Sequence, residues 1–332
     1  MSATRRQIIL GGASLCALGA CKTARAAAPK PGDPVTPRLE PSTIAVTKPS
    51  TWPSLVAAVR GVVELAGGLA FIRPGQKVLL KPAVNSSRPY PATADPEVVL
   101  AVARLVQEAG GEPFIADRTM FMRSTALTFR ALGLDQAARE AKISCQPLDH
   151  AEVVSLRHPL ATHWADQRIR VYRPVADADH VINLCTPRTH RLGDFTMAMK
   201  NFVGVVDGGA RLAMHGPFGL KQRLAEISLV VRPSFVLMDG RKGFTDGGPD
   251  EGDLATLDFM AAGSDPLAID AVGLGYLRMA GANRAISSGS VWSLPMMKHA
   301  AELGIGAASA AQLVLRGMDA TAEAGLRARL EA

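Results

Sequence analysis

Polar and charged side chains stand at the ends of several short apolar runs of the kind that form β-strands. Those nearest the carboxyl ends of the runs are Lys81, Asn85, Asn183, Arg188 and His190. In open parallel sheets, ligands bind at the carboxyl ends of the strands. Cations there can hold the negative charge of a small molecule, and amides can orient it. The pattern predicts a binding site for an anionic small molecule, with the first four as substrate-binding residues.

A second group of polar residues lies in the segment 195–203. Lys200 and Asn201 interrupt an otherwise apolar pattern with helical spacing. A charge in such a place is paired, faces a ligand, or extends along apolar surface to reach water. We predict His190 and Lys200 as catalytic residues, with His190 as the acid–base group. Asn201 is predicted to join the substrate-binding residues.

Three further residues offer a mixed nitrogen and oxygen ligand set for a divalent metal, namely Asp117, His215 and Asp239. The alternative for each aspartate is a turn or a helix cap. Outside the N-terminal segment only Cys145 and Cys185 remain, so the chain cannot hold a four-cysteine iron–sulfur cluster by itself. These two cysteines are expected either to form a disulfide or to stay as buried thiols.

The elements that must position these residues alternate between strand and helix. Two apolar runs, 77–81 and 112–116, flank a helix that Asp95-Pro96-Glu97 begins with a cap residue and a proline. Strand, helix and strand at this spacing form a βαβ unit with parallel pairing. Further strands are predicted at 143–148, 168–175, 180–184, 234–238 and 257–262, and further helices at 53–69, 122–141, 195–203, 221–231, 265–279 and beyond 292. Residues 53–332 are therefore predicted to form an α/β fold with a mostly parallel sheet and flanking helices, as one domain or two α/β lobes.

The first 26 residues have the parts of a twin-arginine export signal in the right order. Arg5-Arg6 precedes an apolar stretch, 8–20, which is shorter than the roughly 20 residues that span a bilayer. Residues 27–52 are rich in Pro, Ala, Thr and Lys and predict a linker. We expect the twin-arginine translocase as a partner, and a periplasmic mature protein without a transmembrane helix.

Two ways of processing the signal remain open. Leu18-Gly19-Ala20-Cys21 is similar to a lipobox, which would make Cys21 the lipid anchor of a lipoprotein, whereas Ala24-Arg25-Ala26 offers ordinary cleavage. The signal also holds four of the 37 basic residues and none of the 30 acidic ones, so most of the formal charge of +7 belongs to it. The remaining chain has no arginine-rich stripe with aromatic residues, and a nucleic-acid partner is not expected.

The motifs, taken in order, resemble those of the uncharacterised domain-of-unknown-function 362 family across roughly residues 75–275. They are Lys77-Val78-Leu79-Leu80-Lys81-Pro82, Asp95-Pro96-Glu97-Val98-Val99, residues 179–184 with Thr189-His190, Met199-Lys200-Asn201-Phe202 with Gly204, Gly248-Pro249 with Gly252, and residues 264–271. The resemblance implies no settled activity. Some members of the family carry ferredoxin-like clusters, and this chain lacks that part.

The chain departs from the family pattern at two places. The family pattern has Pro-Lys-x-Lys-Thr-His after the buried strand, and here Thr186 and Arg188 replace the two lysines. Ala83 stands where the family has an asparagine, and Asn85 lies two residues later. An arginine does not shuttle protons as an amine does, so the departure favours a binder over an enzyme.

Three functions are consistent with these residues, and whether the chain is an enzyme stays open. The first is an exported α/β protein that binds or transforms an anionic small molecule. The second is a periplasmic binding or assembly protein without catalysis. The third is a metal- or iron–sulfur-associated redox protein, which the export route favours because that route carries folded proteins, often with a cofactor inserted.

Overall fold

The computed structural model describes residues 41–216 and 218–332. The expected export signal and both processing sites lie outside the described residues. The predicted linker, 27–52, lies partly outside them, and its described end is not a linker. Ser42–Thr47 forms strand β1, and Ile44, Ala45 and Val46 in it are buried. The strand was not predicted because the segment as a whole is rich in proline and alanine, although the run Ser42–Thr47 itself is rich in β-branched residues.

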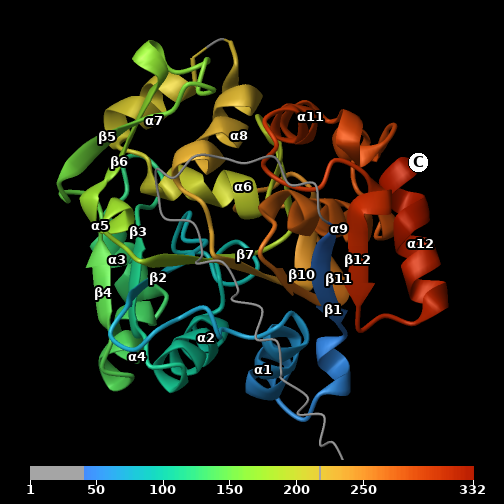
Figure 1. Cartoon of the computed structure of the whole chain (residues 1–332), viewed down its shortest axis with the longest axis horizontal. Coiled ribbons are helices and arrows are strands. Elements are labelled where there is room, and N and C mark those ends of the chain that lie inside the picture. Colours follow the sequence, from blue (N-terminus) through green and yellow to red (C-terminus); the bar gives the residue numbers. More distant parts are fainter. Residues whose placement is uncertain (1–40, 217) are drawn as a thin grey trace, which may run out of the picture.

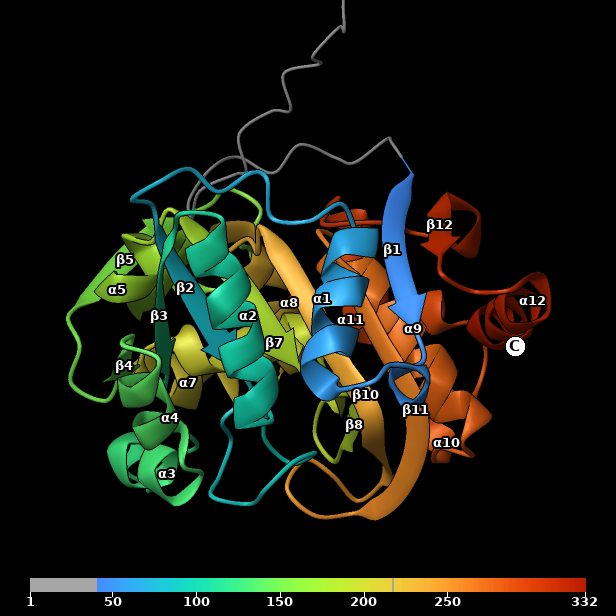
Figure 2. The ribbon, with the colours of Figure 1, turned by 90° about the horizontal axis from the view of Figure 1, so that it is seen from below.

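One ten-stranded sheet runs through the molecule (Figures 1 and 2) in the order β12-β1-β11-β10-β7-β2-β3-β4, with β8 and β9 at the side of β10. Its strands are β1, β2 (Lys77–Pro82), β3 (Glu112–Asp117), β4 (Ser144–Pro147), β7 (His180–Cys185), β8 (Arg188–His190), β9 (Asp194–Thr196), β10 (Phe235–Asp246), β11 (Asp253–Gly263) and β12 (Leu313–Arg316). Along the main path, β11 pairs antiparallel with both neighbours and the other pairs are parallel. The predicted α/β fold with a mostly parallel sheet is confirmed.

Helices cover both faces of the sheet, as Figure 1 shows. On one face lie α1 (Leu55–Leu65) and α2 (Pro96–Glu108), and on the other lie α6 (Ala198–Asn201), α8 (Leu220–Val230), α9 (Pro266–Met279) and α11 (Pro295–Glu302). Successive strand residues point to opposite faces, so Leu79 of β2 joins one apolar core while Val78 and Leu80 join the other. Two covered faces explain why β2 and β7 are buried almost along their whole length.

The remaining elements lie around this sandwich. They are α3 (Thr125–Ala131), α4 (Leu134–Glu140), α5 (Arg173–Ala176), α7 (Gly208–Met214), α10 (Arg284–Ser287), α12 (Ala320–Glu331), the two-stranded sheet of β5 (Val153–Arg157) and β6 (Arg168–Tyr172), and the 3₁₀-helices η1 (Pro49–Thr51), η2 (Ala165–Gln167), η3 (Phe202–Val205), η4 (Val291–Ser293) and η5 (Ala310–Gln312). Within the described ranges, no helix combines the length and the apolar character needed to cross a membrane.

The helix starts predicted from aspartate and proline are confirmed. The Asp95 carboxylate accepts a hydrogen bond from the backbone of Glu97 (2.9 Å) at the start of α2. Asp265 caps α9 in the same way through the backbone of Ala268 (3.0 Å). In both helices proline occupies the first turn, where no intrahelical N–H bond is lost.

Four predicted elements differ from the structure. The strand predicted at 168–175 ends at Tyr172, and α5 follows it. The segment 195–203 is not one helix, because β9 ends at Thr196 and the short α6 and η3 follow. The strand predicted at 234–238 continues to Asp246 and forms a long hairpin with β11. The helical C-terminal segment is interrupted by β12, which pairs with β1. Local periodicity does not report these strand pairings: β9 pairs with β8 and β10 with β11, close by in the sequence, whereas β12 pairs with the distant β1.

Candidate functional site

A cavity opens at the carboxyl ends of β2 and β3, where the sequence predicts ligand binding. Its interior volume is about 50 Å³. Its walls are Lys81, Ala83, Val84, Asn85, Asp117, Arg118, Arg188, Thr196, Lys200, Asn201, Val203, Gly204, Arg211 and Pro249. The strand order turns at β2, with β3 and β4 on one side and β7 and β10 on the other. Such a reversal is where open α/β sheets bind their ligands.

The floor of the cavity is a buried ion pair between Lys81 and Asp117. Lys81 Nζ lies 3.0 Å from Asp117 Oδ1, and it also donates to the Pro82 carbonyl (2.7 Å) and to Asn201 Oδ1 (3.0 Å). All three N–H donors of the ammonium are therefore used. Burial lowers the pKa of Lys81 and raises that of Asp117, and the attraction between the two charges opposes both shifts. Lys81 contributes positive charge to the cavity without a spare donor.

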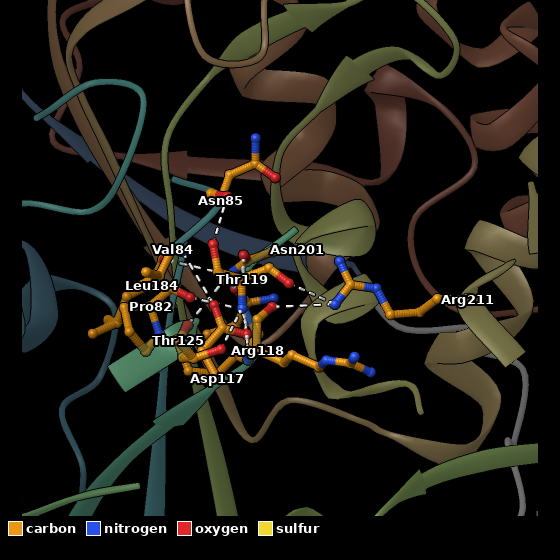
Figure 3. A network of polar contacts seen from close by, with 12 residues as sticks. Pro82, Val84, Asn85, Asp117, Arg118, Thr119, Thr125, Leu184, Asn201 and Arg211 are labelled. Carbon is orange, nitrogen blue, oxygen red and sulfur yellow. Dashed lines mark hydrogen bonds and ion pairs between the residues drawn. The ribbon is translucent and has the colours of Figure 1, made fainter. Parts of the chain in front are cut away.

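Asp117 organises the neighbouring backbone (Figure 3). Its carboxylate accepts hydrogen bonds from the backbone N–H groups of Arg118 (2.8 Å) and Val84 (3.1 Å) in addition to the lysine. Gly204 lies directly against it, because a Cβ at that position would meet Asp117 Oδ1 at 1.9 Å. Glycine is therefore required at 204 if Asp117 is to keep its place.

Asn183 on the neighbouring strand β7 and Asn201 at the end of α6 support the floor of the cavity. Asn201 Nδ2 donates to Asn183 Oδ1 (2.7 Å), to the Lys81 carbonyl (3.2 Å) and to the Leu184 carbonyl (3.3 Å). Asn183 is fully buried, donates to the Ala198 carbonyl (2.7 Å) and does not line the cavity. Asn201 does line the cavity, but its amide oxygen and nitrogen are already engaged in hydrogen bonds within the protein. Both predicted binding residues therefore lie at the site as supports for its floor.

Lys200 reaches the cavity because a distant carboxylate fixes the start of its helix. The buried Asp270 of α9 accepts hydrogen bonds from the backbone N–H groups of Ala198 (2.6 Å) and Met199 (3.2 Å). These groups begin α6 and lack intrahelical partners. Burial raises the pKa of Asp270 to about 8, with the two hydrogen bonds acting in the opposite direction. Asp270 therefore fixes the position from which Lys200 extends.

Lys200 has the properties of an acid–base group. Its ammonium has neither a hydrogen-bond nor an ion-pair partner among the described residues. Burial, and then the charges of Arg188 and Arg211, lower the pKa of Lys200 to about 7. A group with a pKa near the working pH exchanges protons most effectively.

Arg188 and Arg211 are buried cations without a carboxylate partner in the described part of the chain. Arg188 Nη1 donates to the carbonyls of Ala92 and Pro249, and its pKa, lowered by burial to about 10, leaves it charged at neutral pH. Arg211 Nη1 donates to the Thr119 carbonyl (2.9 Å), and Figure 3 shows it reaching towards Arg118 and Thr119. Both Nε atoms are buried and have no hydrogen-bond partner among the described atoms.

His190 lies beside the cavity but is not one of its walls. Its Nδ1 accepts hydrogen bonds from the backbone N–H groups of Leu192 and Gly193, both at 3.1 Å. Burial, then Lys200 and Arg188, lower the pKa of His190 to about 2. A histidine that is neutral across the physiological range with one nitrogen occupied is poorly suited to the acid–base role predicted for it. Lys200 is the better group for that role.

The predicted metal ligands Asp117, His215 and Asp239 do not assemble into a shared group in the described chain. Asp117 is bound to Lys81, and Asp239 accepts hydrogen bonds from Arg241 and from the Tyr90 hydroxyl (3.0 Å). The exposed His215 has Nδ1 2.7 Å from the Arg211 carbonyl. Both aspartates are engaged by cations that strand-end position alone does not reveal.

Asn85 and the two cysteines complete the predicted residues. Asn85 lines the cavity, and its Nδ2 donates to Asp250 (2.5 Å) on the β10–β11 loop.

Cys145 and Cys185 are free thiols, so the disulfide alternative is excluded. Burial raises the pKa of Cys145 to about 12 and that of Cys185 well above its usual value, so neither thiol is reactive near neutral pH.

Arg211 and Gly204 complete the site in ways that strand-end reasoning does not reveal. Arg211 comes from α7, a short helix whose position depends on tertiary contacts, and its sequence carries no local signal. Gly204 and Asp270 belong to motifs that resemble the family, and that resemblance is the one sequence signal for them. The site is thus built from β2, β3, β8, α6, η3 and α7 together.

Comparison of the chain with known proteins finds the same family that the order of the sequence motifs resembles. The family described as a domain of unknown function (DUF362) matches residues 78–275. The thylakoid-associated protein sll1697 of Synechocystis sp. is 34% identical over 231 residues, which cover 66% of this chain and 68% of that protein. Among solved structures, the lactate racemase apoprotein of Thermoanaerobacterium thermosaccharolyticum aligns with a TM-score of 0.46 and 12% identity, over 71% of this chain and 57% of that one. This chain thus spans little more than half of the racemase chain's length. The family match contains Lys81, Asp117, Arg188, Lys200, Arg211 and Asp270, and the chain belongs to the DUF362 family.

Proposed function

We propose that the chain binds an anionic small molecule in the cavity at the carboxyl ends of β2 and β3. The observation that carries this is a surplus of positive charge. Among the described residues, the walls hold five cationic side chains, those of Lys81, Arg118, Arg188, Lys200 and Arg211, and one carboxylate, that of Asp117. Buried unpaired cations are costly, and an anionic ligand would offset that cost.

Within this proposal the cations have different roles. Arg188, Lys200 and Arg211 have no carboxylate partner in the described chain, and they bind the negative groups of the ligand. Lys81 is saturated by its neighbours and supplies charge and shape. If the ligand is transformed, Lys200 is the group that gives or takes the proton, because its pKa is lowered to about 7 by burial and by the neighbouring arginines.

Isothermal titration calorimetry with sulfate, phosphate and small mono- and dicarboxylates tests the binding. At least one of these anions should bind the wild-type chain with a stoichiometry of one. Losing one charge-assisted hydrogen bond costs about 1.5–3 kcal/mol, so Arg211→Met should weaken that binding by roughly tenfold or more. Arg139→Met, which removes an exposed cation on α4, should leave it unchanged. The absence of binding by the whole panel, or equal losses in both variants, would refute the proposal.

We also propose that this cavity works outside the cytoplasm, after export by the twin-arginine translocase. The support is the order of Arg5-Arg6, the short apolar stretch and the small-residue cleavage site. Replacing both arginines by lysine should leave the precursor in the cytoplasm when fractions are compared by immunoblotting. Unchanged export would contradict the twin-arginine route. Cys21→Ala decides the processing, since loss of membrane association would identify Cys21 as a lipid anchor.

A further inference from the structure

A second group of chemically active side chains lies away from the cavity, on the face of the sheet that α8 and α11 cover. His163 lies in the turn between β5 and β6, Glu226 lies on α8, and His299 lies on α11. The helices α8 and α11 pack against each other on this face (Figure 1). One ligand atom from each of the three side chains falls within 4.8 Å of the other two.

The carboxylate of Glu226 is the centre of the group. Its side chain is 0% exposed, and the side chains that reach it in the described chain are the two imidazoles. His163 Nδ1 lies 2.6 Å and His299 Nε2 lies 3.0 Å from the same atom, Glu226 Oε1. A buried carboxylate is costly unless its charge is balanced, and a cation bound beside it would balance that charge.

The two rings are arranged as metal ligands rather than as a stacked pair. Their centroids lie 5.1 Å apart in an edge-to-face arrangement with 83° between the planes, and one nitrogen of each ring faces Glu226 Oε1. Two histidines and one glutamate are a ligand set that zinc takes in sites with an open fourth position. The side chain of His163 is 36% exposed and that of His299 is 16% exposed, so a water molecule can reach that fourth position.

The surroundings also have the features of a metal site. His299 Nδ1, the nitrogen turned away from Glu226, lies 3.7 Å from Glu302 Oε2 on the next turn of α11. This distance is longer than a hydrogen bond. A small movement of the exposed Glu302 side chain would bring it within reach, where a carboxylate behind a ligating histidine fixes the ring and strengthens its lone pair. The backbone of His163 is held at both ends, since its N–H donates to Glu226 Oε2 (3.1 Å) and its carbonyl accepts from Arg223 Nε (2.8 Å).

We infer that His163, Glu226 and His299 bind one divalent transition-metal ion, with Zn²⁺ the best match to this ligand set. The Zn–N and Zn–O bonds of such sites are about 2.0–2.2 Å long, and tetrahedral geometry then separates neighbouring ligand atoms by about 3.3 Å. The present separations of 2.6 and 3.0 Å from Glu226 Oε1 require the histidine rings to move outward by a few tenths of an ångström. The partly exposed His163 can make most of this movement. The ion would join the β5–β6 turn to α8 and α11, and it does not depend on the anion bound in the cavity.

Metal titration of the full chain tests this site. Because Cys16 and Cys21 can bind zinc themselves, every variant carries Cys16→Ser and Cys21→Ser as a shared background. After treatment with a chelator, calorimetry with Zn²⁺ should show one site, and Co²⁺ should give visible absorption bands typical of nitrogen and oxygen ligands. Zn²⁺ should also raise the melting temperature of this background protein.

Ligand variants and a matched control distinguish the site from adventitious binding. His163→Ala and His299→Ala should each weaken Zn²⁺ binding by more than the roughly 10–100-fold expected for the outer-shell change Glu302→Gln, and should abolish the Co²⁺ bands. His150→Ala, which removes an exposed histidine elsewhere, should change neither. His163 is partly exposed, so its variant is expected to fold even if a change at the buried Glu226 does not. No one-site binding by the background protein, or binding that survives the double variant His163→Ala/His299→Ala, would overturn the inference.

Discussion

Titration of Lys200 gives the sharpest prediction for the cavity. In the ligand-free chain, burial and then the charges of Arg188 and Arg211 lower the pKa of Lys200 to about 7. Lys200 is then about nine-tenths protonated at pH 6 and about one-tenth protonated at pH 8. If the anion binds the protonated form, the apparent affinity falls in proportion to that fraction. Between these two pH values the affinity should drop roughly tenfold, which corresponds to about 1.4 kcal/mol.

The sign of this dependence follows from the charges. Protonated Lys200 attracts the anion, so binding is strongest below the pKa and weakens as the pH rises through it. Arg188 does not contribute to the pH dependence of anion binding, because its pKa, lowered by burial to about 10, keeps it charged over the same pH range. Sulfate is a suitable probe, since its own charge does not change between pH 6 and pH 9.

The assay is calorimetric titration with sulfate at several pH values, in buffers of different ionisation enthalpy, to count the protons taken up. Lys200→Met should bind weakly and show no slope between pH 6 and pH 8. Lys200→Arg, which stays charged, should bind with little pH dependence and more tightly than the wild type at pH 8. A slope of the same size in Lys200→Met would refute the assignment of the titrating group to Lys200.

Three further changes test how the site is supported. Gly204→Ala places a Cβ 1.9 Å from Asp117 Oδ1, so it should destabilise the fold by about 1–3 kcal/mol and weaken sulfate binding. Gly325→Ala on α12, where the added Cβ meets open space, should do neither. Thermal denaturation measures the stability of both variants, and calorimetry measures their sulfate binding. Asp270→Ala leaves two buried backbone N–H groups of α6 without an acceptor, and it should lower the free energy of unfolding in urea by about 2–5 kcal/mol; a loss below about 0.5 kcal/mol would contradict its role. His190→Ala should change sulfate affinity less than threefold, and a loss as large as that of Arg211→Met would show that His190 takes part in the site after all.

The fold class and part of the cavity could be predicted from the sequence because local patterns determine them. Lys81, Asn85, Arg188, Lys200 and Asn201 line the cavity, as expected for residues that follow parallel strands or interrupt an apolar helix. The capped helix starts also follow from local chemistry. The strands β1 and β12 and the antiparallel pairing of β11 with β1 were not predicted, because β1 pairs with β11 and β12, which lie more than 200 residues away in the sequence.

The roles within the site depend on contacts that the sequence does not report. Asn183 supports the floor because Asn201 and Ala198 lie beside it. The pKa of His190 is lowered because the ring is buried beside Lys200 and Arg188. The same holds for the proposed metal ligands. His163 and His299 lie 63 and 73 residues from Glu226, and no short motif connects them. Charge pairing in the folded state also removes Asp117 from the predicted metal ligands.

The binding of an anion between the unpaired cations is the central claim, and anomalous X-ray diffraction from crystals containing selenate tests it most directly. Selenium gives an anomalous signal that identifies the anion without reference to the protein. We predict a selenate peak in the cavity, within hydrogen-bond distance of Arg188, Lys200 or Arg211, which weakens in Arg211→Met. Selenate found on the outer surface alone, with an empty cavity, would contradict the claim.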